Sequence, residues 1–343
     1  MTSPFTGLGV TLPVLAAPMA GGPTSAELVV AAARAGSLGF LAGGYKTADA
    51  LAEQISAVRS TGVGFGVNLF APNPVPADPA AFRTYARAIA GEGERYAVDM
   101  LDAPITEDDD RWREKIDLLL ADPVAVAGFT FGIPEPSVIA ALRKAGTLVV
   151  QTVTSAEEAR RAAESGVDAL AVQASAAGGH SGTLTPERIP PAVPLTDLIA
   201  QVRRAVPLPM VATGGLATPD GVAEALRAGA GAVMVGTVLL RCDEAATSAP
   251  FRAALADPSR TGTLVTRAFT GRPARALHNG FTDRYSDIAP AGYPALHYLT
   301  SPMRKAAAAA GDPERINLWA GTGYRHAAAE PAGRILTRLA SSI

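Results

Sequence analysis

The stretch best equipped for chemistry is residues 172–183, VQASAAGGHSGT, which follows the apolar run 169–172. His180 stands here among glycines, which let a backbone approach a ligand closely. Gln173 adds an amide, with one acceptor and two donors, at the end of the apolar run. A glycine-rich turn with an incidental surface histidine would look similar. The position directly after a buried strand instead predicts a ligand site with His180 as its reactive side chain.

Two further glycine-containing pairs also follow apolar runs. They are Gly214-Gly215 and Gly236-Thr237. In α/β barrels the backbone N–H groups at the ends of the last two strands, with a helix N-terminus, commonly bind phosphate. Each pair alone has an ordinary packing explanation, but together they predict a phosphorylated ligand.

Other kinds of reactive site have no counterpart in the sequence. There is no Gly-x-Ser-x-Gly nucleophile, the single cysteine is Cys242, and no Asp/His cluster has metal-ligand spacing. We interpret the acidic run 108–110 as a solvated helix start rather than a metal site. The remaining groups are His180, Gln173, the amide of Asn68 and backbone donors, a set without strong acids or bases. We therefore expect a bound cofactor to carry the hard chemistry, and no metal.

Eight apolar runs, each followed by a helical pattern, supply the elements that position these residues. The runs are apolar on both faces, as the strands of a covered parallel sheet must be. Eight strand–helix units close a (β/α)₈ barrel, the TIM barrel, whose active sites lie at the C-terminal ends of the strands. We predict these strands at 14–19, 38–42, 64–70, 124–131, 147–153, 169–172, 209–213 and 232–235.

The chain after the eighth strand has a different character. Residues 263–305 hold much of the remaining aromatic and polar chemistry and show no repeat. We predict a barrel over residues 1–262, a lid-like cover over the barrel mouth at 263–305, and C-terminal helices packing back on the barrel at 306–343.

Composition limits the partners. The 343 residues carry a formal net charge of −2, so no basic field attracts nucleic acid or an anionic membrane. The single cysteine indicates a reducing compartment, and we expect a cytoplasmic protein. Residues 1–5 lack the pattern of a signal peptide, and no apolar run reaches the roughly 18 residues of a membrane span.

Motifs spread over nearly the whole chain resemble those of the nitronate monooxygenases, formerly 2-nitropropane dioxygenases. These are FMN-dependent barrels related to the flavin-dependent enoyl-acyl-carrier-protein reductases. The matching stretches are 17–22 (APMAGG), 66–70 (GVNLF), 177–180 (AGGH), 213–215 (TGG), 235–237 (VGT), 293–304 (from YP to LTSPMR), 311–312 (GD) and 318–323 (LWAGTG).

The resemblance implies an enzyme that binds FMN and oxidises alkyl nitronates, or nitroalkanes, with dioxygen to carbonyl compounds and nitrite. His180 would donate a hydrogen bond to the nitro group or remove the α-proton of a nitroalkane, and a histidine near its ordinary pKa does either. Tyr293 would help to close the substrate pocket. The flavin contacts it implies are Ala17, Pro18, Met19, Asn68, Gln173, Gly178, Gly179, Gly214, Gly215, Met234, Val235, Gly236 and Thr237.

Two departures leave substrate preference open. Family members often carry Glu and Arg where this chain has Ala176 and Ser181. The alternatives are an FMN-dependent NAD(P)H reductase of quinones or enoyl thioesters, a flavin-free sugar-phosphate lyase or isomerase, and a non-catalytic flavin carrier. The oligomeric state also stays open.

Overall fold

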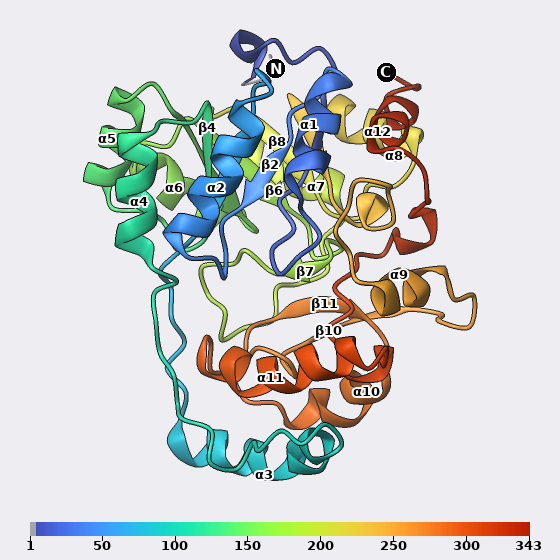
Figure 1. Cartoon of the computed structure of the whole chain (residues 1–343). Coiled ribbons are helices and arrows are strands. Elements are labelled where there is room, and N and C mark those ends of the chain that lie inside the picture. Colours follow the sequence, from blue (N-terminus) through green and yellow to red (C-terminus); the bar gives the residue numbers. More distant parts are fainter. Residues whose placement is uncertain (1–4) are drawn as a thin grey trace.

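A closed barrel of eight parallel strands dominates the computed structural model, which describes residues 5–343 (Figure 1). Residues 1–4, on which the signal-peptide prediction partly rests, lie outside the described range. Ala16 N–H donates to Leu38 O at 3.0 Å and so joins the first strand to the second, which closes the barrel. This confirms the predicted (β/α)₈ fold. In the order in which they pair, the strands are β1 (Val14–Ala16), β9 (Ala232–Val235), β8 (Met210–Thr213), β6 (Ala169–Gln173), β5 (Leu148–Val153), β4 (Val126–Phe131), β3 (Gly66–Ala71) and β2 (Phe40–Ala42).

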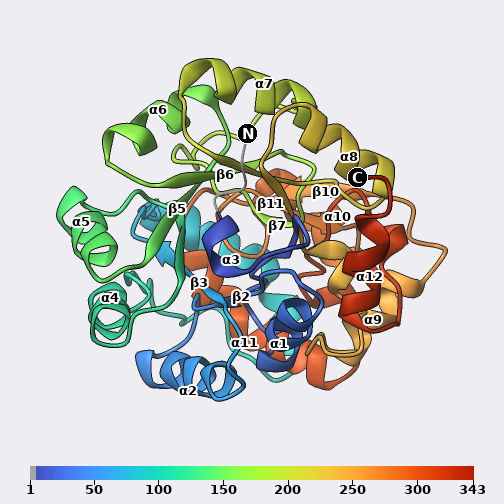
Figure 2. The ribbon, with the colours of Figure 1, turned by 90° about the horizontal axis from the view of Figure 1, so that it is seen from above.

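Helices surround the strands, as the view from above shows (Figure 2). Four of them begin after Ser25, Thr47, Ser155 and Thr218, whose side-chain oxygens accept the backbone N–H three residues on. The last helix of the chain packs between α8 and α1 and completes the ring. The ring comprises α1 (Ala26–Arg34), α2 (Ala48–Arg59), α4 (Trp112–Ala121), α5 (Pro136–Lys144), α6 (Ala156–Glu164), α7 (Leu195–Ala205), α8 (Pro219–Arg227) and α12 (Ala332–Leu339).

Both faces of the strands are buried, which explains their continuous apolar sequence. Inward-facing side chains such as Leu15, Val126 and Val211 fill the barrel. Outward-facing ones such as Val67 and Leu170 pack under the helices. In residues 5–343, no helix is both long and apolar enough to cross a membrane.

A second layer lies beyond the C-terminal ends of the strands (Figure 1). Its antiparallel sheet has the order β10 (Thr263–Thr266), β11 (Ala274–Leu277) and β7 (Gly179–His180). Helices α3 (Pro79–Glu94), α10 (Gly280–Tyr285) and α11 (Ala295–Ala309) pack together in one apolar cluster, which includes Ala268 and Phe269 from the connection between β10 and β11. The other helices are α9 (Ala249–Ala256) and the 3₁₀ turns η1 (Thr6–Leu8), η2 (Thr237–Leu239), η3 (Ser286–Ile288), η4 (Pro313–Arg315) and η5 (Tyr324–His326).

This layer differs from the sequence-based expectation in two respects. It includes α3, which comes from the long connection after β3, because Phe82 and Ile89 of α3 are buried in the same cluster as Phe269. Helix α11 is continuous across the predicted boundary at residue 305. The division of the chain at residues 262 and 305 stays a prediction.

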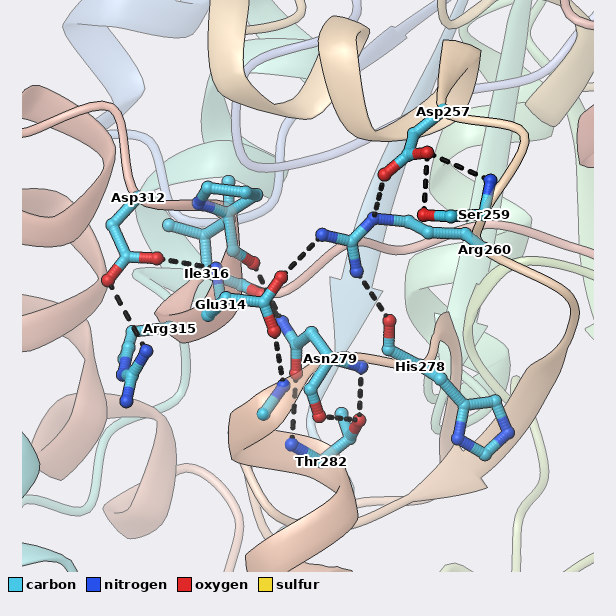
Figure 3. A network of polar contacts seen from close by, with 12 residues as sticks. Asp257, Ser259, Arg260, His278, Asn279, Thr282, Asp312, Glu314, Arg315 and Ile316 are labelled. Carbon is cyan, nitrogen blue, oxygen red and sulfur yellow. Dashed lines mark hydrogen bonds and ion pairs between the residues drawn. The ribbon is translucent and has the colours of Figure 1, made fainter.

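A polar network fixes the chain where it returns from this layer to the barrel (Figure 3). Arg260 Nη2 donates to Glu314 Oε1 at 2.5 Å. Asn279 caps α10 and also donates from Nδ2 to Ile316 O at 2.8 Å. The network therefore anchors residues 312–316, which directly precede the segment 317–323 that lines the main cavity.

Candidate active site

A cavity of about 1160 Å³ lies between the C-terminal strand ends and the second layer. His180 and every residue that the sequence analysis names as a flavin contact line it. Tyr293 does not. It lies behind Phe131 and borders a separate cavity of about 60 Å³. The residues from the sequence analysis that meet at the main cavity are Ala17, Pro18, Met19, Asn68, Gln173, Gly178, Gly179, His180, Gly214, Gly215, Met234, Val235, Gly236 and Thr237.

One end of the cavity is formed by the turns after β8 and β9. Gly215 has φ +78°, a conformation that side-chain-bearing residues rarely adopt. Among residues 5–343 neither the Gly215 nor the Gly236 backbone N–H has a hydrogen-bond partner. Gly215 is exposed and Gly236 half-buried, so both N–H groups face the cavity rather than the protein interior. Two free backbone donors at a cavity wall fit an anionic ligand group such as a phosphate.

Asn68 supplies a third free donor on the cavity floor. Its side chain is 8% exposed, and its Oδ1 accepts the Thr130 hydroxyl at 3.2 Å. Among the described residues its Nδ2 has no partner, so the amide N–H₂ is available to a ligand. The cavity size and these three donors together fit a flavin nucleotide.

Gln173 shapes the loop that carries His180. Its Nε2 donates to the backbone oxygen of His180 at 3.2 Å, and its Oε1 accepts Gly182 N–H at 2.7 Å. The acceptor is therefore already engaged within the protein. A direct flavin contact by Gln173, which stays a prediction, is limited to the second Nε2 hydrogen.

His180 lies in strand β7, not in a turn, because it pairs with Ala274 of β11. Its Nε2 is 2.9 Å from Thr270 Oγ1, while its Nδ1 has no partner among residues 5–343. The ring also contacts Trp319, at 5.3 Å between ring centroids. The second layer thus orients the imidazole against the barrel mouth.

The environment of His180 corrects one expectation. We predict from the sequence a histidine near its ordinary pKa. Burial, with the nearby charges of Arg272 and Arg304, lowers the pKa of His180 to about 3. The ring is therefore neutral at pH 7, and a group with so low a pKa is a weak base.

Acid sensitivity follows from this pKa. The unfolded chain takes up a proton on His180 below about pH 6.5, whereas the folded chain does so only near pH 3. The stabilising contribution is thus full above pH 6.5 and is lost as the pH falls. Between pH 7 and 5.5 we expect wild-type protein to lose about 1 kcal/mol more unfolding free energy than His180→Asn. Urea titrations of both proteins at the two pH values measure this. Equal losses would contradict the low pKa.

Two aromatic side chains of the site, Tyr45 and Trp319, are not among the residues predicted from the sequence. Tyr45 has φ +65° and stacks on His297, with ring centroids 4.1 Å apart. In the sequence, Tyr45 follows Gly43-Gly44 at the end of β2, and this position at the C-terminal end of a strand could have indicated a site residue. Trp319 comes from the 317–323 segment, and no local pattern there indicates a contact with His180.

Two arginines on this side of the cavity are also absent from the residues that the sequence predicts for the site. Arg272 is fully buried, donates to the carbonyls of Asn73 and Thr183, and lies 3.9 Å above the Phe131 ring. Arg304 lines the cavity itself. Among residues 5–343 neither guanidinium forms an ion pair with a carboxylate. Their uncompensated charge makes this side of the cavity electropositive.

The sequence predicts that the acidic run 108–110 begins a helix. This prediction is wrong, because α4 starts only at Trp112. Asp110 instead pairs with the buried Lys115 at 2.7 Å and accepts Tyr45 N–H at 2.9 Å. Asp108 accepts the Tyr298 hydroxyl. In residues 5–343 no group of three or more His, Cys, Asp or Glu side chains is placed to hold a metal ion.

A closed barrel with one large cavity at its C-terminal ends and free backbone donors after β8 and β9 is typical of the cofactor-binding (β/α)₈ enzymes. Comparison with known proteins specifies the family. The sequence model of the family "Nitronate monooxygenase" matches residues 2–341. The chain belongs to this family and is a flavin-dependent oxidoreductase. This confirms the resemblance derived from the sequence motifs.

Individual relatives agree. A "probable nitronate monooxygenase" of Staphylococcus aureus (strain Newman) is 33% identical, over 98% of this chain and 95% of its own length. The crystal structure of a nitroalkane oxidase from Streptomyces ansochromogenes superposes with a TM-score of 0.93 at 46% identity, over 99% of this chain and 97% of that one. FabK from Thermotoga maritima, 24% identical with a TM-score of 0.76 over 100% of this chain and 96% of that one, shares the fold.

Proposed function

We propose that this protein is an FMN-dependent nitronate monooxygenase that oxidises alkyl nitronates with dioxygen to carbonyl compounds and nitrite. One observation carries the proposal. Within residues 5–343, one cavity joins the free backbone donors after β8 and β9 to a neutral histidine, and no strong acid–base pair lies between them. Such a site depends on a bound cofactor for electron transfer.

The flavin would supply the redox chemistry when bound, and the protein would hold and orient it. Gly215 and Gly236 N–H groups would bind its phosphate, since both are free and Gly215 permits close approach. Asn68 Nδ2 would donate to the ring or the ribityl chain. Met19, Gly178 and the other cavity-lining residues of the sequence analysis would pack along it.

His180 would face the substrate and donate a hydrogen bond to the nitro group. This role requires the Thr270 hydroxyl to donate to His180 Nε2, at 2.9 Å, and not to the Arg272 backbone oxygen, at 3.4 Å, so that Nδ1 carries the proton. We propose that Tyr293 acts by supporting His180, since their ring centroids are 5.9 Å apart and Tyr293 lies outside the main cavity. Burial of Cys242 as a free thiol supports a reducing, cytoplasmic setting.

The purified protein should be yellow and release one FMN per chain on heating, because the donors described above suit one flavin phosphate. Anaerobic mixing tests the reaction. We expect an alkyl nitronate to bleach the flavin absorbance and NADH or NADPH to leave it unchanged within the same time. Nitrite should appear once air is admitted.

Other outcomes would contradict the proposal in different ways. Rapid bleaching by NADH or NADPH alone would identify a reductase. Flavin that neither a nitronate nor a nicotinamide cofactor bleaches would indicate a flavin carrier. A colourless protein that does not take up added FMN would remove the cofactor assignment altogether.

A further inference from the structure

Helix α11 brings Arg304, a half-buried cation that forms no ion pair with a described carboxylate, to the cavity. Arg304 donates from Nε to Thr300 Oγ1 at 3.1 Å and from Nη1 to Asn317 Oδ1 at 2.9 Å. Its Nη2 donates to both the backbone oxygen and Nδ1 of His297, at 3.1 and 3.2 Å. All four acceptors are neutral. Burial lowers the pKa of Arg304 only to about 10, so the guanidinium stays charged at pH 7.

The same contact determines the proton position on His297. A guanidinium has only donors, so Nδ1 of His297 must accept and the ring proton must be on Nε2. Burial and the charge of Arg304 hold the pKa of His297 well below its usual range, which keeps the ring neutral. His297 lines the cavity, and in residues 5–343 its Nε2 has no partner. The ring is held in place by its stack on Tyr45.

Other charges around this wall are also mainly positive. Lys46 and Lys305 line the cavity and form no ion pair with any described carboxylate. Of the two cavity-lining aspartates, Asp110 is paired with Lys115, which leaves Asp108 as the one unpaired acid among the lining residues. A cavity wall of this kind attracts anions.

We propose that His297 Nε2–H and the Arg304 guanidinium form an oxyanion subsite on the second-layer side of the cavity, apart from the glycines after β8 and β9. The subsite would hold an anionic oxygen of the substrate, either of the nitronate group or of a carboxylate elsewhere on the molecule. It deepens the proposed function, on which it rests, by selecting the anionic nitronate over the neutral nitroalkane. Arg304 would supply the charge and His297 the directed donor.

Binding of inert anions tests the subsite independently of turnover. Nitrate resembles the nitronate head, propionate supplies a carboxylate, and propionamide is its neutral counterpart. By titration calorimetry on the protein as purified, with its flavin, we expect Arg304→Gln to weaken nitrate or propionate binding by about 10- to 100-fold. Propionamide binding should not change. Arg284→Gln is the matched control, because it removes one charge from the second layer at a residue that pairs with Glu92 and does not line the cavity.

Two readouts separate direct binding from loss of structure. His297→Phe keeps the stack on Tyr45 but removes the donor, so it too should weaken the anions, with an unchanged circular dichroism spectrum. Arg304→Gln should raise the KM for nitronates more than it lowers kcat. Weakening of nitrate alone would assign the subsite to the nitro group, and weakening of propionate alone to a carboxylate. Unchanged binding of both anions, or an equal loss for propionamide, would overturn the subsite even if nitronates are turned over.

Discussion

Gly215→Asp should be purified without flavin. An added Cβ at this position would lie 3.0 Å from Ala176 Cβ and 3.3 Å from Thr322 Oγ1, in a backbone conformation with φ +78° that disfavours side chains. The carboxylate would also face the phosphate that the free Gly215 N–H is proposed to bind. Backbone strain and charge repulsion in a partly desolvated site both weaken FMN binding. We therefore expect the affinity for FMN to fall by at least about 100-fold. Fluorescence titration of the apoprotein with FMN measures this.

A matched control is available on the same chain. Gly311 follows α11 with φ +74°, and a Cβ there would meet nothing within 4 Å. Gly311→Asp therefore introduces the same backbone strain and the same charge outside the cavity, and it should bind FMN normally. Gly215→Ala isolates the steric part and should fall between wild type and Gly215→Asp. Normal FMN binding by Gly215→Asp would show that the phosphate lies elsewhere.

The barrel was predictable because its signals are local. Each strand is a short run that is apolar on both faces, such as Val149-Val150, and many helices begin at a capping residue such as Ser155. Counting eight such units is enough to infer closure. Since barrel sites lie at the C-terminal strand ends, the same count assigns Asn68, Gly215 and His180 to one rim of the barrel from their sequence positions alone.

The second layer was less predictable because its contacts are non-local. Strand β7 has only two residues, and it forms only because β11, about 95 residues later in the sequence, offers Ala274 as its partner. Helix α3 joins this layer through Phe82 and Ile89, whose burial depends on a partner helix far along the chain. The low pKa of His180 has the same origin, since it arises from burial and from arginines distant in sequence.

Replacement of His180 should slow catalysis without releasing the cofactor. A group with a pKa of about 3 is poorly matched to removing a proton at neutral pH, which favours hydrogen-bond donation from Nδ1 over the base role. Loss of one such donor in a preorganised site costs about 10²-fold in kcat. His180→Phe keeps an aromatic ring but has no donor, so we expect the flavin-replete variant to turn over preformed nitronates about 10²-fold more slowly. If His180 were instead a base for nitroalkanes, the same change would abolish nitroalkane turnover and spare nitronates.

Thr270 allows the donor role to be tested without touching His180. Thr270→Val removes the hydroxyl that would donate to Nε2 and hold the proton on Nδ1, so nitronate turnover should fall, by about 10-fold for one lost hydrogen bond, and Thr270→Ser should restore it. The wild-type rate should show no inflection from His180 between pH 5.5 and 8, since its titration lies far below that range. An inflection near pH 6.5 that disappears in His180→Asn would instead support the base role. Wild-type activity of flavin-replete His180→Phe on both nitronates and nitroalkanes would make His180 a packing residue. Phe can neither donate a hydrogen bond nor remove a proton, so neither function would then depend on His180.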